Sequence, residues 1–211
     1  MTRPVLHVLA GVNGAGKSTV GGYLLKRDDL TWFNPDTFAR ELMTRSNYDQ
    51  MTANASAWHE GMRRLNEAIA SCQNFAFETT LGGKTVSERI LLTTKTHDVQ
   101  VWFCGLASPE LHIARVQARV LAGGHPVSEL KIRERYPKAQ LNLIRLMPHI
   151  AYLGLYDNSA EADGRGIVPD PVRLLEMEHG KLIRPSPDDP IALERTPDWA
   201  RPIVAAAFRL T

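Results

Sequence analysis

Short apolar runs alternate with longer amphipathic stretches along most of this chain. The short runs are rich in β-branched and aromatic residues, as strands are, and the candidate strands are residues 5–10, 31–33, 75–78, 99–106 and 152–156. The longer stretches have apolar positions at helical spacing and are residues 17–27, 37–44, 53–71, 85–94, 109–121 and 138–147. This alternation predicts an α/β fold, with a mostly parallel five-stranded sheet and helices on both faces.

Prolines and glycines indicate where several elements begin and end. Ser108 can cap a helix that has Pro109 in its first turn. Pro137 interrupts a helical pattern that runs from residue 127 to 147, so we expect a break there. Beyond Asn158 we expect a peripheral hairpin, residues 172–176 with 181–184, and a last helix from Asp198. We therefore expect a core at residues 1–159 and a peripheral segment at residues 160–211 of the same domain.

Composition and charge exclude several classes of protein. The chain has 211 residues, of which 44% are apolar, and this favours one domain with one core. The net charge of +2 produces no strong field, which argues against nucleic acid and acidic membranes as partners. Cys72 and Cys104 fit neither a metal site nor a disulfide scaffold. The apolar run of residues 5–10 is too short for a membrane span or a signal peptide, so we expect a cytoplasmic protein.

The strongest chemical motif follows the first candidate strand and opens the first candidate helix. It is the P-loop, or Walker A, pattern, made by Gly11, Val12, Asn13, Gly14, Ala15, Gly16, Lys17, Ser18 and Thr19. Its glycines let backbone amides point at phosphate oxygens, and a helix N-terminus favours an anion. We expect Lys17 to reach the β and γ phosphates of ATP, and the Ser18 hydroxyl to ligate Mg²⁺. An ordinary glycine-rich turn is the alternative, but the flanking strand and helix favour ATP.

Carboxylates and hydroxyls follow two other candidate strands, at the sheet edge where ligands bind in such folds. Asp36 could accept the proton of an acceptor hydroxyl and orient its oxygen toward the γ phosphate. It could also serve only the helix dipole. Glu78, Thr79 and Thr80 could hydrogen-bond a polyhydroxylated acceptor. Alternatively, Glu78 is a solvated charge and the threonines cap the next helix.

A glycine pair between arginines predicts a small lid at about residues 121–137. Arg115 and Arg119 precede the Gly-Gly-His segment of residues 123–125, and Arg133 and Arg135 follow it. Such a lid would exclude water and neutralise charge on the triphosphate. Charged residues on a helix are more often a solvated face, so we expect at least half of these arginines to have no role in catalysis.

Taken together, these motifs resemble the zeta-toxin family of P-loop kinases over residues 1–159, and the Gly-Gly-His segment resembles a smaller chromosomal branch of it. The resemblance rests on residues 11–19, 34–36, 77–80, 119–125, 133–136 and 156–159. It implies a nucleotide-kinase-like sheet, transfer from ATP to a hydroxyl of UDP-N-acetylglucosamine, and an antitoxin protein as a potential partner. It implies that Asp36 is the catalytic base, that Glu78 binds the sugar, and that Lys17, Arg119 and Arg135 act at the phosphates. Around the acceptor we expect Asn34, Glu78, Thr79, Thr80 and His125.

Two alternatives to this kinase stay open at the level of sequence. The first is a kinase of another small acceptor with a hydroxyl, such as an antibiotic or another metabolite. The second is an ATP-binding switch that transfers nothing, although the presence of both Lys17 and Asp36 argues against it.

Overall fold

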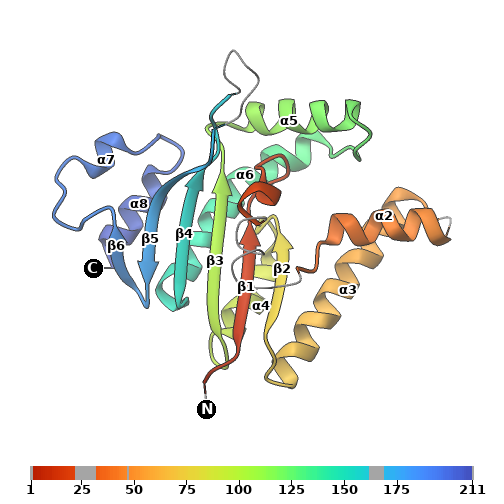
Figure 1. Cartoon of the computed structure of the whole chain (residues 1–211), viewed down its shortest axis with the longest axis horizontal. Helices are drawn as coiled ribbons and strands as arrows, with labels where there is room; N and C mark the ends of the chain where they lie inside the picture. The colour runs from red at the N-terminus through yellow and green to blue at the C-terminus, as the bar shows by residue number, and fades with distance from the viewer. Residues whose placement is uncertain (1, 22–31, 47, 162–168, 211) are drawn as a thin grey trace.

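The computed structural model describes residues 2–21, 32–46, 48–161 and 169–210. Its centre is a six-stranded sheet in the order β2-β1-β3-β4-β5-β6 (Figure 1). The strands are β1 (Val5–Ala10), β2 (Phe75–Thr79), β3 (Asp98–Gly105), β4 (Tyr152–Asp157), β5 (Val172–Glu178) and β6 (Lys181–Arg184). The first four are parallel, and β5 and β6 are antiparallel to their neighbours. This confirms a mostly parallel α/β fold.

The predicted number of five strands is wrong for two reasons. The hairpin of β5 and β6 pairs with β4 and so extends the main sheet, with Leu155 opposite Leu175. Within the described part of residues 31–33, Phe33 makes only an isolated bridge to Phe77. Its N–H donates to Ala76 O and its carbonyl accepts from Glu78 N. The pairing ends there because Pro35, which has no N–H to donate, begins a helix.

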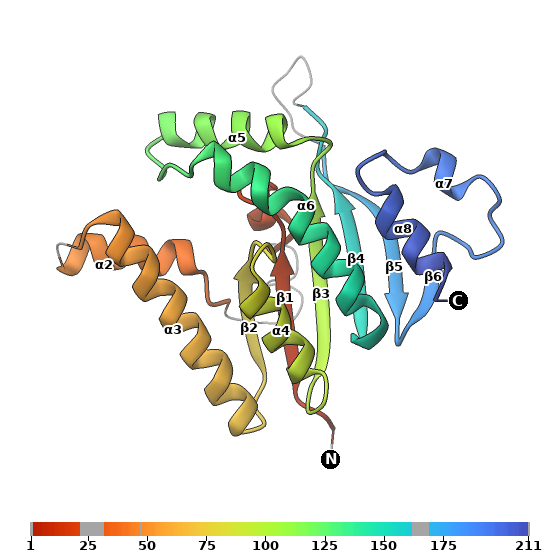
Figure 2. The same cartoon turned by 180° about the vertical axis from the view of Figure 1, so that it is seen from behind.

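Helices α4 (Lys84–Thr93), α6 (Glu129–Leu146) and α8 (Arg201–Phe208) cover one face of the sheet (Figure 2). On the other face, the predicted helix 17–27 is described only for residues 17–21, and residues 22–27 lie outside the described ranges. Helix α5 (Pro109–Leu121) crosses the carboxyl ends of the strands, while α2 (Pro35–Ser46) and α3 (Gln50–Ala70) stand beside β2 (Figure 1). The short α7 (Ala192–Arg195) precedes α8, which starts three residues later than predicted.

The core lies between the sheet and the layer of α4, α6 and α8. Val101, Leu143 and Ile203 come from strand and helix and are fully buried there. Burying one such side chain contributes roughly 1.5–3 kcal/mol, so this layer fixes the positions of the strand ends. The C-terminal segment joins the core through Trp199, whose ring lies against Gly105 of β3. A Cβ atom at Gly105 would come within 2.1 Å of that indole.

The helix boundaries around the predicted lid are partly as expected. Ser108 caps α5, since its Oγ accepts from Leu111 N at 3.2 Å, and Pro109 lies in the first turn. The expected break at Pro137 is wrong, because α6 continues through this residue. An internal proline costs about 3 kcal/mol. Both halves of α6 nevertheless bury residues on the core, including Ile132 before the proline and Leu143 after it, and this packing offsets the cost.

Candidate active site

The turn between β1 and residue 17 has a backbone that favours glycine at three positions. Gly11, Gly14 and Gly16 have positive φ values of 145°, 86° and 80°. A Cβ atom at Gly14 would lie 2.6 Å from His112 O, and one at Gly16 would lie 2.1 Å from Asn158 Nδ2. The predicted phosphate loop therefore has the tight turn and the close backbone contacts that its sequence requires.

Lys17 is half-buried and opens the helical segment of residues 17–21. Its Nζ donates to Gly11 O at 3.0 Å, so the ammonium group lies over the loop itself. Ser18 and Thr19 follow in the first helical turn and are exposed. The ammonium group and the start of a helix both favour a bound anion at this place.

A cavity of about 540 Å³ lies next to the phosphate loop. It brings together the phosphate loop, the end of β2, the start of α2, the loop of residues 125–128 and the first half of α6. Most of the predicted site residues outside the loop line this cavity. They are Asn34, Asp36, Glu78, Thr79, Thr80, His125 and Arg135, together with Asn13 and Lys17 from the loop.

Asn34 is the residue that caps α2. Its Oδ1 accepts from Asp36 N at 2.9 Å and from Thr37 N at 3.1 Å. The helix therefore does not depend on the Asp36 carboxylate for its first N–H groups. That carboxylate lines the cavity, with Oδ2 3.5 Å from His125 Nε2.

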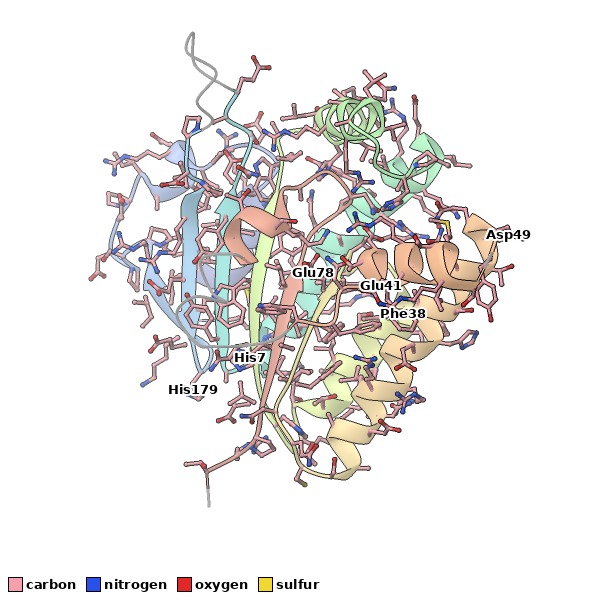
Figure 3. All side chains as sticks on the ribbon, turned by 45° about the vertical axis from the view of Figure 1, so that its right-hand side comes forward. His7, Phe38, Glu41, Asp49, Glu78 and His179 are labelled. Atoms are coloured by element: carbon pink, nitrogen blue, oxygen red, sulfur yellow. The ribbon has the colours of Figure 1, made fainter. Side chains whose placement is uncertain are left out.

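Glu78 lies at the end of β2, near the start of α2 (Figure 3). Burial raises the pKa of its carboxyl group above the ordinary value, and the charge of Asp36 acts in the same direction. The charge of Lys17 and a hydrogen bond from Asn34 oppose this shift of the pKa. Because ionised Glu78 has lost most of its water, a hydroxyl group or a cation that enters the cavity would stabilise it.

The two arginines predicted to act at the phosphates have different surroundings. Arg135 lines the cavity, and its Nη1 donates to Asn13 Oδ1 in the phosphate loop at 2.8 Å. Arg119 does not line the cavity. Its Nη2 donates to His125 O at 3.0 Å, and its side chain packs against Gly124. Arg119 thus supports the loop that carries His125, whereas Arg135 connects α6 to the phosphate loop.

His125 is a half-buried histidine on the loop between α5 and α6. Burial holds its pKa below the usual value, and the positive charges of Arg119 and Arg40 lower the pKa further. The nearby Asp36 carboxylate opposes them. The ring can donate a hydrogen bond to Asp36 in its neutral form, through Nε2–H.

Sequence reasoning missed one wall of the cavity and two groups beneath the phosphate loop. The wall comes from α3 and is formed by Asn54, Ala57, Trp58, Gly61, Met62 and Leu65. Apolar positions of a helix do not reveal from sequence whether they face a core or a cavity. His112 and Asn158 contact the loop from α5 and from the residue after β4. Asn158 belongs to a segment, residues 156–159, that the sequence had already singled out, whereas no pattern marked His112.

Mg²⁺ is implied by the phosphate loop, and the donor set fits it. The Ser18 hydroxyl is exposed in the first helical turn, beside the loop. Across the described residues, no group of three or more His, Cys, Asp or Glu side chains could hold a metal ion. A phosphate-bound Mg²⁺ needs only one or two protein oxygens, because phosphates and water supply the other ligands.

A comparison with protein families decides the family of this chain. The family model described as an AAA domain matches residues 6–138, more than half of the 211 residues. The chain belongs to this AAA-domain family. The matched part of this AAA-domain protein holds the phosphate loop and every cavity-lining residue named above, up to Arg135. Within the described ranges, none of its helices combines the length and the apolar character that a membrane span requires.

Other proteins are similar to this AAA-domain chain in sequence or in structure. An uncharacterised protein of Haemophilus influenzae is 27% identical over 128 residues, which cover 60% of this chain and 88% of that protein. The PezAT chromosomal toxin-antitoxin system of Streptococcus pneumoniae matches with a TM-score of 0.57 and 18% identity, over 74% of this chain and 68% of that one. The AvrRxo1-ORF1:-ORF2 structure with ATP matches with a TM-score of 0.63 and 14% identity, over 86% and 60%. The family match and these two structures together indicate a P-loop kinase-like fold.

Proposed function

We propose that this AAA-domain protein is an ATP-dependent kinase of a small molecule, which moves the γ-phosphoryl group of ATP to a hydroxyl of a sugar nucleotide such as UDP-N-acetylglucosamine. The observation that carries the proposal is that Lys17, Asp36, Glu78 and Arg135 line one cavity beside the phosphate loop. A cavity of about 540 Å³ has the size of a small-molecule site. The resemblance of this chain's motifs to the zeta-toxin family supports the choice of acceptor.

In the proposed reaction, the acceptor oxygen forms a bond to the γ phosphorus while the bond from that phosphorus to the β–γ bridging oxygen breaks, and ADP leaves. Asp36 accepts the proton of the acceptor hydroxyl. Lys17 and Arg135 stabilise the negative charge on the phosphate oxygens, and Glu78 accepts hydrogen bonds from other hydroxyls of the acceptor. Mg²⁺ held at Ser18 would screen the charges of the β and γ phosphates when it is bound.

Arg119 has a different role from the one that its motif implied. Because it does not line the cavity and donates to the carbonyl of His125, we assign it to the support of the lid loop rather than to the phosphates. Since ATP and sugar nucleotides occur together in the cytoplasm, the proposed reaction would take place there. The lid, residues 121–137, would close over the nucleotide.

The direct test is to incubate the purified protein with Mg·ATP and UDP-N-acetylglucosamine and to identify products by mass spectrometry and ³¹P NMR. We expect ADP and a phosphomonoester of the sugar nucleotide in equal amounts. If this acceptor stays unchanged, the same assay with a metabolite extract identifies another acceptor. Tight ATP binding with no phosphorylated product from either mixture would refute the kinase and favour an ATP-binding switch.

Because one of the similar structures is a toxin-antitoxin system, we also propose an antitoxin protein as a partner of this chain. An antitoxin would inhibit the kinase until it is removed. If the chain acts as such a toxin, its expression alone should arrest growth, and the Lys17→Ala variant should relieve the arrest. Equal growth with both forms would remove the antitoxin from the proposal and leave the kinase activity untouched.

A further inference from the structure

Two buried side chains hold the phosphate loop from beneath, and neither takes part in the proposed transfer. Asn158 Nδ2 donates to Ala15 O at 2.9 Å. His112 Nδ1 lies 2.9 Å from Asn13 O. Asn158 is 5% exposed and His112 is 1% exposed. The two contacts involve alternate carbonyl groups of the same loop, and they come from different elements.

The protonation state of His112 follows from its partner. A backbone carbonyl can only accept, so Nδ1 must carry the proton that it donates to Asn13 O. Burial lowers the pKa of His112 to about 4, which keeps the ring neutral near pH 7. Tyr136 fixes the ring from one side, with ring centroids 5.6 Å apart and planes at 74°. His112 is thus a fixed, uncharged donor.

Asn158 is held in place by the end of β4. Its own N–H donates to Gly105 O at 3.0 Å. The residues on both sides are anchored as well: Trp199 Nε1 donates to Asp157 Oδ1 at 3.2 Å, and Ala107 N donates to Ser159 Oγ at 2.8 Å. Its amide nitrogen lies so close to Gly16 that no side chain fits between them. The segment of residues 157–159 therefore presents one rigid amide donor to the loop.

The orientation of each of these carbonyls fixes the orientation of the next N–H group in the phosphate loop. In a planar trans peptide, the C=O of one residue and the N–H of the next point in opposite directions. The carbonyl of Asn13 points at His112, so the N–H of Gly14 points away from His112. The carbonyl of Ala15 points at Asn158, so the N–H of Gly16 points away from Asn158.

These two amides also donate no hydrogen bond to the described backbone. Within the part of the chain that the structure describes, Ala15 N donates to Val12 O, but neither Gly14 N nor Gly16 N donates to a backbone carbonyl. An N–H group that is oriented but unpaired is a donor for an anion. We propose that His112 and Asn158 are positioning residues, which preset the amides of Gly14 and Gly16 for the phosphates of a nucleoside triphosphate.

The inference rests on the nucleotide-binding part of the proposed function and needs no transfer. It is tested with Asn158→Leu and His112→Leu, which remove the donor and add no charge, by calorimetric titration of each folded variant with Mg·ATP. Each should raise the Kd about ten- to a hundredfold, the scale for losing an oriented hydrogen bond to a charged group. His112→Asn places an amide nitrogen near the position of Nδ1 and should keep the Kd within a few-fold of the parent.

The matched control is Asn142→Leu. Asn142 is another buried asparagine, whose Nδ2 donates to Leu81 O at 2.8 Å, away from the phosphate loop. This variant should lower the melting temperature about as much as Asn158→Leu does, and it should leave the ATP Kd unchanged. If Asn142→Leu weakens ATP as much as Asn158→Leu, or if the latter binds ATP like the parent, the inference is wrong. If Asn158→Leu does not fold, Asn158→Ala, which removes the donor and adds no charge, is titrated in its place.

A second measurement reads the two amides directly. In protein labelled with ¹⁵N-glycine, the Gly14 and Gly16 amide resonances should shift downfield on addition of Mg·ATP, and by much less in His112→Leu and Asn158→Ala. Equal shifts in parent and variants would overturn the inference. A parent that binds ATP with these shifts but phosphorylates nothing would uphold the inference and refute the kinase, so the two proposals fail separately.

Discussion

Replacement of Asp36 by Asn separates its proposed role as a base from a role in the helix. The variant keeps the shape of the side chain and removes the group that accepts a proton. Asn34 already caps α2, and the Asp36 side chain is 44% exposed. The loss of stability should therefore stay below about 1 kcal/mol, the scale for a charge at a helix end. The 3.5 Å contact with His125 adds little, because burial lowers the pKa of His125 and keeps its ring neutral, and 3.5 Å is long for a hydrogen bond.

The effect on transfer should be much larger. Loss of a general base slows a reaction ~10²- to 10⁴-fold. At 1.36 kcal/mol for each factor of ten, this adds ~2.7–5.4 kcal/mol to the barrier. The change in the barrier thus exceeds the change in stability severalfold, and ATP affinity should stay within a few-fold because Asp36 does not belong to the phosphate loop.

The assay is single-turnover transfer from labelled ATP, with the acceptor identified by mass spectrometry, beside the ATP Kd and the free energy of unfolding. Glu129→Gln is the control. It removes an exposed acid from the first turn of α6, and this residue does not line the cavity. If Asp36→Asn transfers at the parent rate once folded, or if both variants slow transfer equally, Asp36 is not the base.

Three further predictions concern single residues of the site. Lys17→Ala should slow transfer ~10²- to 10³-fold in a steady-state assay, and near-normal turnover would contradict the assigned phosphate site. Glu78→Gln should raise the KM for the acceptor more than the KM for ATP, whereas equal increases would mean that Glu78 does not contact the acceptor alone. The pKa of His112 is about 4 in the folded protein against an ordinary 6.5, so the unfolded chain binds more protons between these values. Stability should fall as the pH drops through that window, by up to about 3 kcal/mol, and denaturant titrations of His112→Asn should lack this part of the loss.

The parts that could be predicted from sequence are those set by local structure. The phosphate loop needs glycines at positions with positive φ and a strand and helix on either side, and all of these are visible within residues 5–21. The grouping of Lys17 with Glu78 followed from topology, since parallel strands end at one edge of the sheet. Ser108 and Pro109 fixed the start of α5 because capping depends on neighbours along the chain.

The remaining parts depend on contacts between distant segments. Trp58 and Met62 look like core positions of an amphipathic helix, and only the placement of α3 beside β2 makes them a cavity wall. His112 follows the same logic, because its partner is 99 residues away in the chain. Pro137 failed as a helix breaker because the packing of α6 on the core outweighs a local preference. The roles of the site residues stay predictions until the variants are measured.

The contact between Trp199 and Gly105 changes how the C-terminal segment should be regarded. The indole fills the space that a side chain at position 105 would need, and its Nε1 binds the carboxylate of Asp157. A chain shortened to residues 1–159 would keep every recognised motif, yet it would have an open apolar gap over β3, and Asp157, next to Asn158, would lose its indole donor. Shortened proteins made for crystallisation or for activity screens should therefore retain the C-terminal segment that carries Trp199. Because Trp199 binds the neighbour of Asn158, a natural substitution in this segment can alter nucleotide affinity without a change in the phosphate loop.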